Sequence, residues 1–286
     1  MSDHRQVSLG RKVAYGFGSV AFGVKSNGFD YFFLIFYSQV MGVSAYLVSL
    51  ALMIALIVDA LSDPLIGYLS DNTRSRWGRR HPFMYAAALP AAIAYYFVWN
   101  PPSGLEGDAL FPYIVTIAVV VRTLVTVYEI PSSSLVAEMS DDYDERTSML
   151  SYRYFFGWTG GTLMGAFATI FILVPTTTIS NGMFNVQGHG QVGAVAAMVI
   201  FVAMIVSTMG THKMIPDLKA PPPPRRMTVG LIYREVFETL ASRSFLALFL
   251  AALFGAVAAG VSTTLSFYFS TFFWGFTTCL LYTSPS

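Results

Sequence analysis

Charged residues are scarce in this chain of 286 residues, because Lys, Arg, Asp and Glu together make up only 12% of it. Soluble domains hold about 25%, so the supply is too small to cover a surface that faces water. Hydrophobic residues make up 55% of the chain, and the mean hydropathy is +0.57. We therefore predict an all-α polytopic membrane protein. A soluble enzyme, a disordered chain and a secreted disulfide scaffold are excluded.

Cysteine and histidine are scarce as well. The single cysteine, Cys279, excludes a disulfide framework and a cysteine-based metal site. The four histidines show no pair at a metal-ligand spacing, and no phosphate-binding glycine loop or nucleophile–base pair is visible. The first residues are polar and do not resemble a cleavable signal. We therefore expect no enzymatic activity, no cofactor and no resident metal.

Long apolar segments, by contrast, are abundant. A helix that spans a bilayer needs about 20 mostly apolar residues, and seven segments meet this need: 13–39, 45–70, 83–99, 111–138, 147–174, 192–210 and 245–274. The connection after the sixth segment is long, contains Pro221 to Pro224, and continues into an amphipathic run from Ile232 to Leu240. Six helices, a linker and a further helix form the layout of a transporter built from two six-helix halves.

This layout divides the chain into four parts. We predict a six-helix transmembrane bundle over 1–210 and a cytoplasmic linker with an amphipathic helix over 211–243. The first helix of a second, incomplete bundle follows over 244–276. The last residues, 277–286, resemble translated sequencing-adapter sequence, so we interpret them as an artefact at the end of a truncated gene model.

Lys and Arg are distributed unequally over the connections. Of the 17, 14 lie in the N-terminal stretch and in the second, fourth and sixth connections, whereas the first, third and fifth connections hold none. Such an excess marks the cytoplasmic side of a membrane protein. The N-terminus is therefore predicted to be cytoplasmic.

Seven ionisable residues lie inside the predicted helices: Asp30, Asp59, Asp63, Glu129, Lys25, Arg122 and Arg153. Charges at membrane depth are costly and usually functional. If all seven share one interior, four acids against three bases leave one negative charge, which would bind a cation or a proton. This arithmetic predicts a transporter that is coupled to a cation.

The spacing of these charges suggests how they are grouped. Asp59 and Asp63 are four residues apart, so they lie on one helix face, where two carboxylates would share a proton or hold a hard cation such as Na⁺. At about 1.5 Å of rise per residue, these two acids belong to the cytoplasmic half of the membrane. Asp30 and Arg122 belong to the outer half, at similar heights that would allow them to pair.

Glycines recur on the fifth predicted helix, at Gly157, Gly160, Gly161 and Gly165. Small residues at such spacing let two membrane helices approach closely. We predict that they form a packing seam.

The stretch from Asp59 to Arg80, DALSDPLIGYLSDNTRSRWGRR, resembles the glycoside–pentoside–hexuronide:cation symporters of the major facilitator superfamily. The sequences KVAYGFG at Lys12 to Gly18 and YEIP at Tyr128 to Pro131 fit the same family. The resemblance covers about 1–274. It implies the N-terminal six-helix bundle of a major facilitator fold plus a seventh helix.

The resemblance also implies roles for individual residues. Asp59, Asp63 and Thr126 match the family's cation site, and Glu129 and Arg153 match its sugar-binding residues. The family's cytoplasmic loop motif, which holds helices together during the conformational switch, is matched by Gly67, Asp71, Gly78, Arg79 and Arg80.

The chain departs from the family on the first helix. Gly23 stands where the family has an aspartate that contacts both sugar and cation, and Phe22 stands where it has a lysine. We predict that Lys25 and Asp30 replace these contacts, and we add Arg122 to the substrate-binding group. The substrate should then differ from a simple galactoside. The missing carboxylate also favours H⁺ over Na⁺.

Together these observations predict a secondary active transporter in the bacterial inner membrane. It would move a sugar or glycoside with Na⁺ or H⁺ by alternating access, with Na⁺ bound at Asp59 and Asp63 if Na⁺ is the cation. The expected partners are the sugar, the cation and the lipid bilayer, with neither nucleic acid nor a second subunit.

Two alternatives remain open. A lipid-like or drug-like substrate fits less well with a polar, charged cavity. A seven-helix receptor or retinal protein competes on helix count. A receptor would have its N-terminus outside, however, and a retinal protein needs a lysine on the last helix, where this chain has none.

Overall fold

The computed structural model describes residues 7–176, 181–218, 230, 234, 238, 239 and 241–275. These described residues form helices and connections, with no strand among them. Six helices in this part are long and apolar enough to cross a membrane: Ala45–Asn72, His81–Trp99, Gly107–Met139, Tyr143–Ile172, Val186–His212 and Arg243–Ser262. The prediction of an all-α multi-pass membrane protein is confirmed. Most of the predicted helix from Ile232 to Leu240, and all of 277–286, lie outside the described residues.

The first predicted segment, 13–39, is helical but is not one uninterrupted α-helix. It consists of α1 (Leu9–Phe17), α2 (Ser19–Asn27), the π-helical turn η1 (Gly28–Phe32), α3 (Phe33–Ile35) and a second π-helical turn, η2 (Phe36–Val40). Gly18, between α1 and α2, has right-handed helical dihedral angles, so the chain continues in the same direction. With this segment, the described residues contain the six helices of the predicted bundle and one further helix.

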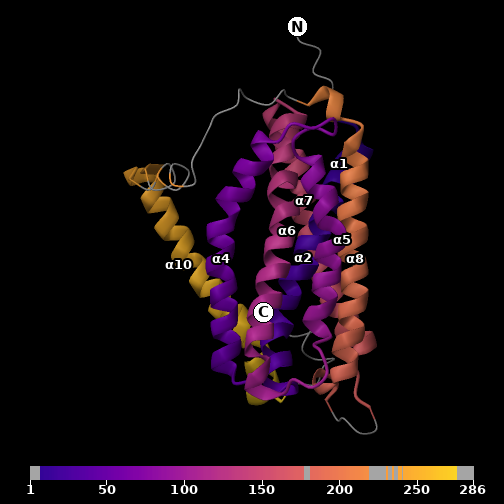
Figure 1. The fold of residues 1–286 in the computed structure, drawn as a ribbon, viewed down its shortest axis with the longest axis vertical. Helices are drawn as coiled ribbons and strands as arrows, with labels where there is room; N and C mark the ends of the chain where they lie inside the picture. The colour runs from indigo at the N-terminus through magenta and orange to yellow at the C-terminus, as the bar shows by residue number, and fades with distance from the viewer. Residues whose placement is uncertain are drawn as a thin grey trace.

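The remaining helices follow the predicted order. They are α4 (Ala45–Asn72), α5 (His81–Trp99), η3 (Gly107–Leu110) leading into α6 (Phe111–Met139), α7 (Tyr143–Phe167) with η4 (Ala168–Ile172), η5 (Gly182–Phe184), α8 (Val186–His212), η6 (Ile215–Asp217), α10 (Arg243–Tyr268) and η7 (Phe269–Phe273). The long helices of the bundle run along the long axis of the molecule in Figure 1, whereas α10 leans away from them. α10 contacts the bundle at η1, and its apolar span is not buried against it.

Polar contacts group the connections at the two ends of the bundle. At one end, the amide of Ser44 donates to Oδ1 of Asp108 (2.8 Å), which joins the first connection to the third. At the other end, the amide of Val7 donates to Oε1 of Glu145 (2.6 Å), which joins the N-terminal stretch to the start of α7. The basic connections therefore meet at one end, as the distribution of Lys and Arg predicts.

Glycines bring α2 and α7 into close contact. A Cβ atom built on Gly23 would lie 1.9 Å from the carbonyl oxygen of Gly157, and one built on Gly161 would lie 2.7 Å from the carbonyl oxygen of Gly23. The predicted packing seam is confirmed at these positions. The two backbones leave no room for a side chain at Gly23, the position where the resemblance implies an aspartate.

We expect Gly23→Ala to lower the melting temperature of the purified protein, because the added methyl group overlaps the backbone of α7. Overpacking of this kind costs about 1–3 kcal/mol. Gly10→Ala is the matched control, since nothing lies within 4 Å of a Cβ built on Gly10, and it should leave the melting temperature unchanged or raise it. Thermal unfolding in detergent measures both variants. Equal melting temperatures would show that α2 and α7 do not meet at Gly23.

Candidate functional site

Asp59 on α4 and Arg122 on α6 form an ion pair that joins the two helices. Nη2 of Arg122 lies 2.8 Å from Oδ2 of Asp59, and Nε donates to the same oxygen at 3.0 Å. The hydroxyl of Thr126, one turn further along α6, donates to Oδ1 of Asp59 at 3.0 Å. Both carboxylate oxygens of Asp59 therefore accept hydrogen bonds, and each side chain of the ion pair is only 15% exposed.

The ion pair that similar heights would allow between Asp30 and Arg122 is not formed. Arg122 pairs with Asp59 because α4 and α6 pack against each other, whereas Asp30 lies on η1 and is exposed. The assignment of Arg122 to a separate outer layer of charge fails for the same reason. Without Asp30, the seven predicted interior charges reduce to three acids and three bases. A surplus of negative charge is therefore not what distinguishes this interior.

Asp63 has different surroundings from Asp59, although it lies only one helical turn away. Its Oδ1 is buried and accepts no hydrogen bond from the described part of the chain. None of the described basic side chains forms an ion pair with it. A buried carboxylate oxygen without a donor is costly, and a proton or a cation would relieve that cost.

Glu129 on α6 forms an ion pair with Arg153 on α7. Nη1 of Arg153 also donates to the hydroxyl of Ser132 (2.9 Å), and its guanidinium carbon lies 5.4 Å from the centre of the Tyr15 ring. Oε2 of Glu129 is buried and has no donor among the described residues. This oxygen is free to accept a charge-assisted hydrogen bond, such as one from a sugar hydroxyl.

Lys25 on α2 is buried, with 6% of the residue exposed. Its Nζ lies 4.7 Å from the centre of the Phe22 ring, and no acid in the described ranges forms an ion pair with it. Asp59 and Arg122 are close enough to interact with it electrostatically. Lys25 thus adds a buried positive charge beside the Asp59–Arg122 ion pair.

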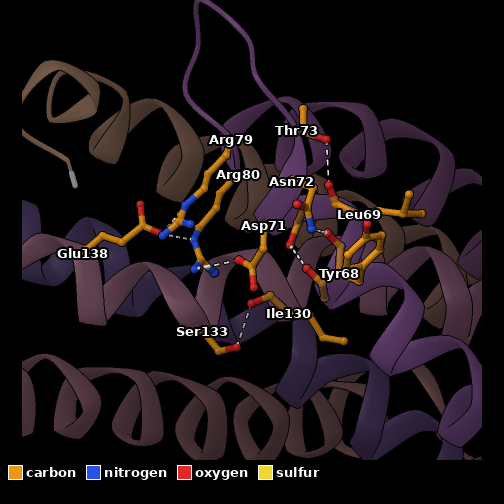
Figure 2. Close-up of polar contacts among 12 residues, drawn as sticks. Tyr68, Leu69, Asp71, Asn72, Thr73, Arg79, Arg80, Ile130, Ser133 and Glu138 are labelled. Carbon is orange, nitrogen blue, oxygen red and sulfur yellow. Dashed lines mark hydrogen bonds and ion pairs between the residues drawn. The ribbon is translucent and has the colours of Figure 1, made fainter. Parts of the chain in front are cut away.

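Figure 2 shows a second group of charges, in which Asp71, Arg79, Arg80 and Glu138 lie together. Nε and Nη2 of Arg79 donate to Oε1 of Glu138 at 2.9 and 2.7 Å. Arg80 forms ion pairs with Glu138 and, at 3.1 Å, with Asp71. Gly78 has φ +75°, a backbone conformation that favours glycine. The predicted loop residues Asp71, Gly78, Arg79 and Arg80 are thus brought together, whereas a role for Gly67 stays a prediction.

Glu138 on α6 was not predicted from the sequence. Only 3% of its side chain is exposed, and it accepts hydrogen bonds from both arginines of the loop. A lone acid at the end of an apolar segment, on the same side as a basic connection, is the one sequence feature that could have identified it. Together, Glu138 and the loop join the end of α4 to the end of α6.

Comparison with known proteins identifies the family. Residues 14–283 match the family model described as MFS/sugar transport protein. The chain belongs to this family. The resemblance to cation symporters of the major facilitator superfamily is thereby confirmed, and the family is one of transporters.

Several symporters are similar to this chain. An uncharacterized symporter of Synechocystis sp. is 32% identical over 203 residues, which cover 69% of this chain and 36% of that protein. The inner membrane symporter YicJ of Escherichia coli is 27% identical over 232 residues, which cover 81% and 48%. The isoprimeverose transporter of Lactiplantibacillus pentosus is 26% identical over 222 residues, which cover 76% and 45%. The chain thus spans less than half the length of these relatives.

We expect Glu138→Gln to loosen the loop between α4 and α5, because two arginines would then face a neutral amide. Breaking a buried ion pair by removing one partner costs about 3–5 kcal/mol. The measurement is the rate at which a thiol reagent labels a cysteine placed at Arg74, which is exposed, with Cys279 replaced by serine. The labelling rate should rise.

Asp141→Asn is the matched control. Its ion pair with Arg146 (3.3 Å) is 67% exposed on the Asp141 side, and exposed pairs contribute only about 0–1 kcal/mol. This variant should label at the wild-type rate. If Glu138→Gln also labels at the wild-type rate, Glu138 does not hold the loop.

Proposed function

We propose that this chain is the N-terminal half of a secondary active transporter that moves a sugar or glycoside together with a cation. The membrane would be the bacterial inner membrane, with the N-terminus in the cytoplasm and a single copy as the working unit. Membership of the MFS/sugar transport protein family supports the proposal. So does the similarity to an isoprimeverose transporter.

One observation carries the proposal: two neighbouring ion pairs on α6 each lie beside a carboxylate oxygen that lacks a donor. Oδ1 of Asp63 lies near the Asp59–Arg122 pair, and Oε2 of Glu129 belongs to the pair with Arg153. A cation or proton fits the first oxygen, and a sugar hydroxyl fits the second. Since α6 bears one partner of each ion pair, Arg122 and Glu129, binding at one oxygen would change the electrostatic environment of the other, as coupled transport requires.

We assign the following roles in substrate binding and in the conformational switch. Arg153 holds Glu129 in position, aided by the hydroxyl of Ser132 and the ring of Tyr15. Glu129 then accepts a hydrogen bond from the sugar. The loop that contains Arg79 and Arg80 holds the ends of α4 and α6 together through Glu138, and its release would accompany the conformational switch between the two sides of the membrane.

The complete gene product, reconstituted in vesicles, provides the test. We expect it to take up a radiolabelled glycoside from a panel of pentosides and hexosides when a cation gradient is imposed. Glu129→Gln should weaken uptake by about 10- to 100-fold, because a hydrogen bond to a charged group contributes about 1.5–3 kcal/mol. The conservative variant Glu129→Asp should retain more of the uptake.

Glu106→Gln is the control for the loss of a negative charge, since Glu106 is exposed in the third connection. It should transport normally. Normal uptake by Glu129→Gln would contradict the role of Glu129. Uptake of a lysophospholipid with no uptake of any glycoside would instead support the lipid-like alternative.

A further inference from the structure

We propose that Arg122 acts as a built-in cation at the predicted cation site, so that Asp59 does not bind Na⁺ in this transporter. The inference rests on the proposed function, and it concerns which ion can use the pair of carboxylates on α4. The residues concerned are Asp59, Asp63 and Thr126, the predicted ligands of the cation.

The hydrogen bonds of Asp59 engage both of its carboxylate oxygens and fill both acceptor sites of Oδ2. Arg122 directs two N–H groups to Oδ2, at 2.8 Å from Nη2 and 3.0 Å from Nε, and Thr126 donates to Oδ1 at 3.0 Å. An alkali cation bound by both oxygens would have to displace Arg122 from Oδ2, because such a cation needs the same lone pairs. Each oxygen of Asp59 therefore already has a partner, and the partner of Oδ2 is positively charged.

The charge of Arg122 is permanent. A guanidinium is not deprotonated in proteins, so this positive charge cannot be removed to admit an ion. With both side chains only 15% exposed, water and salt screen the ion pair less than they screen surface charges. Any Na⁺ placed between Asp59 and Asp63 would lie beside the guanidinium and be repelled by it.

Lys25 increases this repulsion. It is buried on α2, within electrostatic range of Asp59 and Arg122. Of the two predicted carboxylate ligands, only Asp63 keeps a buried oxygen without a donor. A single carboxylate offers a poor set of ligands for Na⁺, which takes several oxygen atoms, by analogy with other hard cations. The site in its wild-type form should therefore not select Na⁺.

The test uses the complete transporter in vesicles and compares the apparent KM for a transported glycoside in Na⁺ with that in choline. The wild type should show the same KM in both salts. Arg122→Met should free Asp59 for Na⁺, so Na⁺ should lower its KM by about tenfold, within the usual range of coupling between two ligands. Arg122→Lys keeps the positive charge and should remain insensitive to Na⁺.

A double variant and a melting-temperature measurement separate an effect of Na⁺ binding from a failure to fold or to transport. The double variant Arg122→Met with Asp59→Asn removes both partners, so it should fold without a bare buried charge and should show no effect of Na⁺. The melting temperature of each variant in Na⁺ and in choline gives a readout that does not depend on transport, and only Arg122→Met should be stabilised by Na⁺.

The possible failures are distinguishable. If no glycoside is taken up under any ion gradient, the proposed function fails. If the wild type takes up a glycoside and Na⁺ lowers its KM, transport stands and the inference about Arg122 is overturned. If Arg122→Met gains neither a KM response nor thermal stabilisation from Na⁺, the inference is overturned as well.

Discussion

The ion pair between Asp59 and Arg122 is the interaction on which the rest of the site depends. Two opposite charges in a shielded part of a membrane protein must be paired or solvated, because an unpaired buried charge is costly. Their pairing joins α4 to α6. It also leaves Asp63, one turn further along α4, with a buried oxygen that has no donor among the described residues. The chemistry of the site follows from this asymmetry between two acids that look equivalent in the sequence.

α6 contributes residues both to the ion pairs inside the bundle and to the charged group at the loop between α4 and α5. Arg122, Thr126 and Glu129 are spaced by four and three residues, so they follow one face of the helix. Glu138, near the end of the same helix, holds the loop between α4 and α5. One helix therefore bears the partner of the cation site, the partner of Arg153 and the anchor of the loop. A movement of α6 would therefore displace the partners of Asp59, of Arg153 and of the loop between α4 and α5.

Much of this architecture follows from the sequence. Long apolar segments predict the helices because the bilayer sets a minimum length. The positions of Lys and Arg group the connections by end because positive residues collect on one side. The glycines on α7 predict close packing, since only small residues allow it. The pairing of Arg153 with Glu129 joins two residues that the resemblance places in the same sugar-binding group.

Other features could not be predicted because they depend on which helices touch. Arg122 was placed by its height along a helix, but height does not show that α6 packs on α4 and brings Arg122 to Asp59. Glu138 receives its partners only when a loop folds back onto α6, and periodicity contains no information about that fold. The absence of a side chain at Gly23 has its reason on another helix, α7.

The most direct measurement is an experimental structure of the complete transporter at saturating Na⁺, at a resolution that shows side chains and bound ions. The guanidinium of Arg122 should stay within hydrogen-bonding distance of Oδ2 of Asp59, with no ion between Asp59, Asp63 and Thr126. Density for an ion coordinated by those three residues, with Arg122 turned away from Asp59, would contradict the arrangement described here.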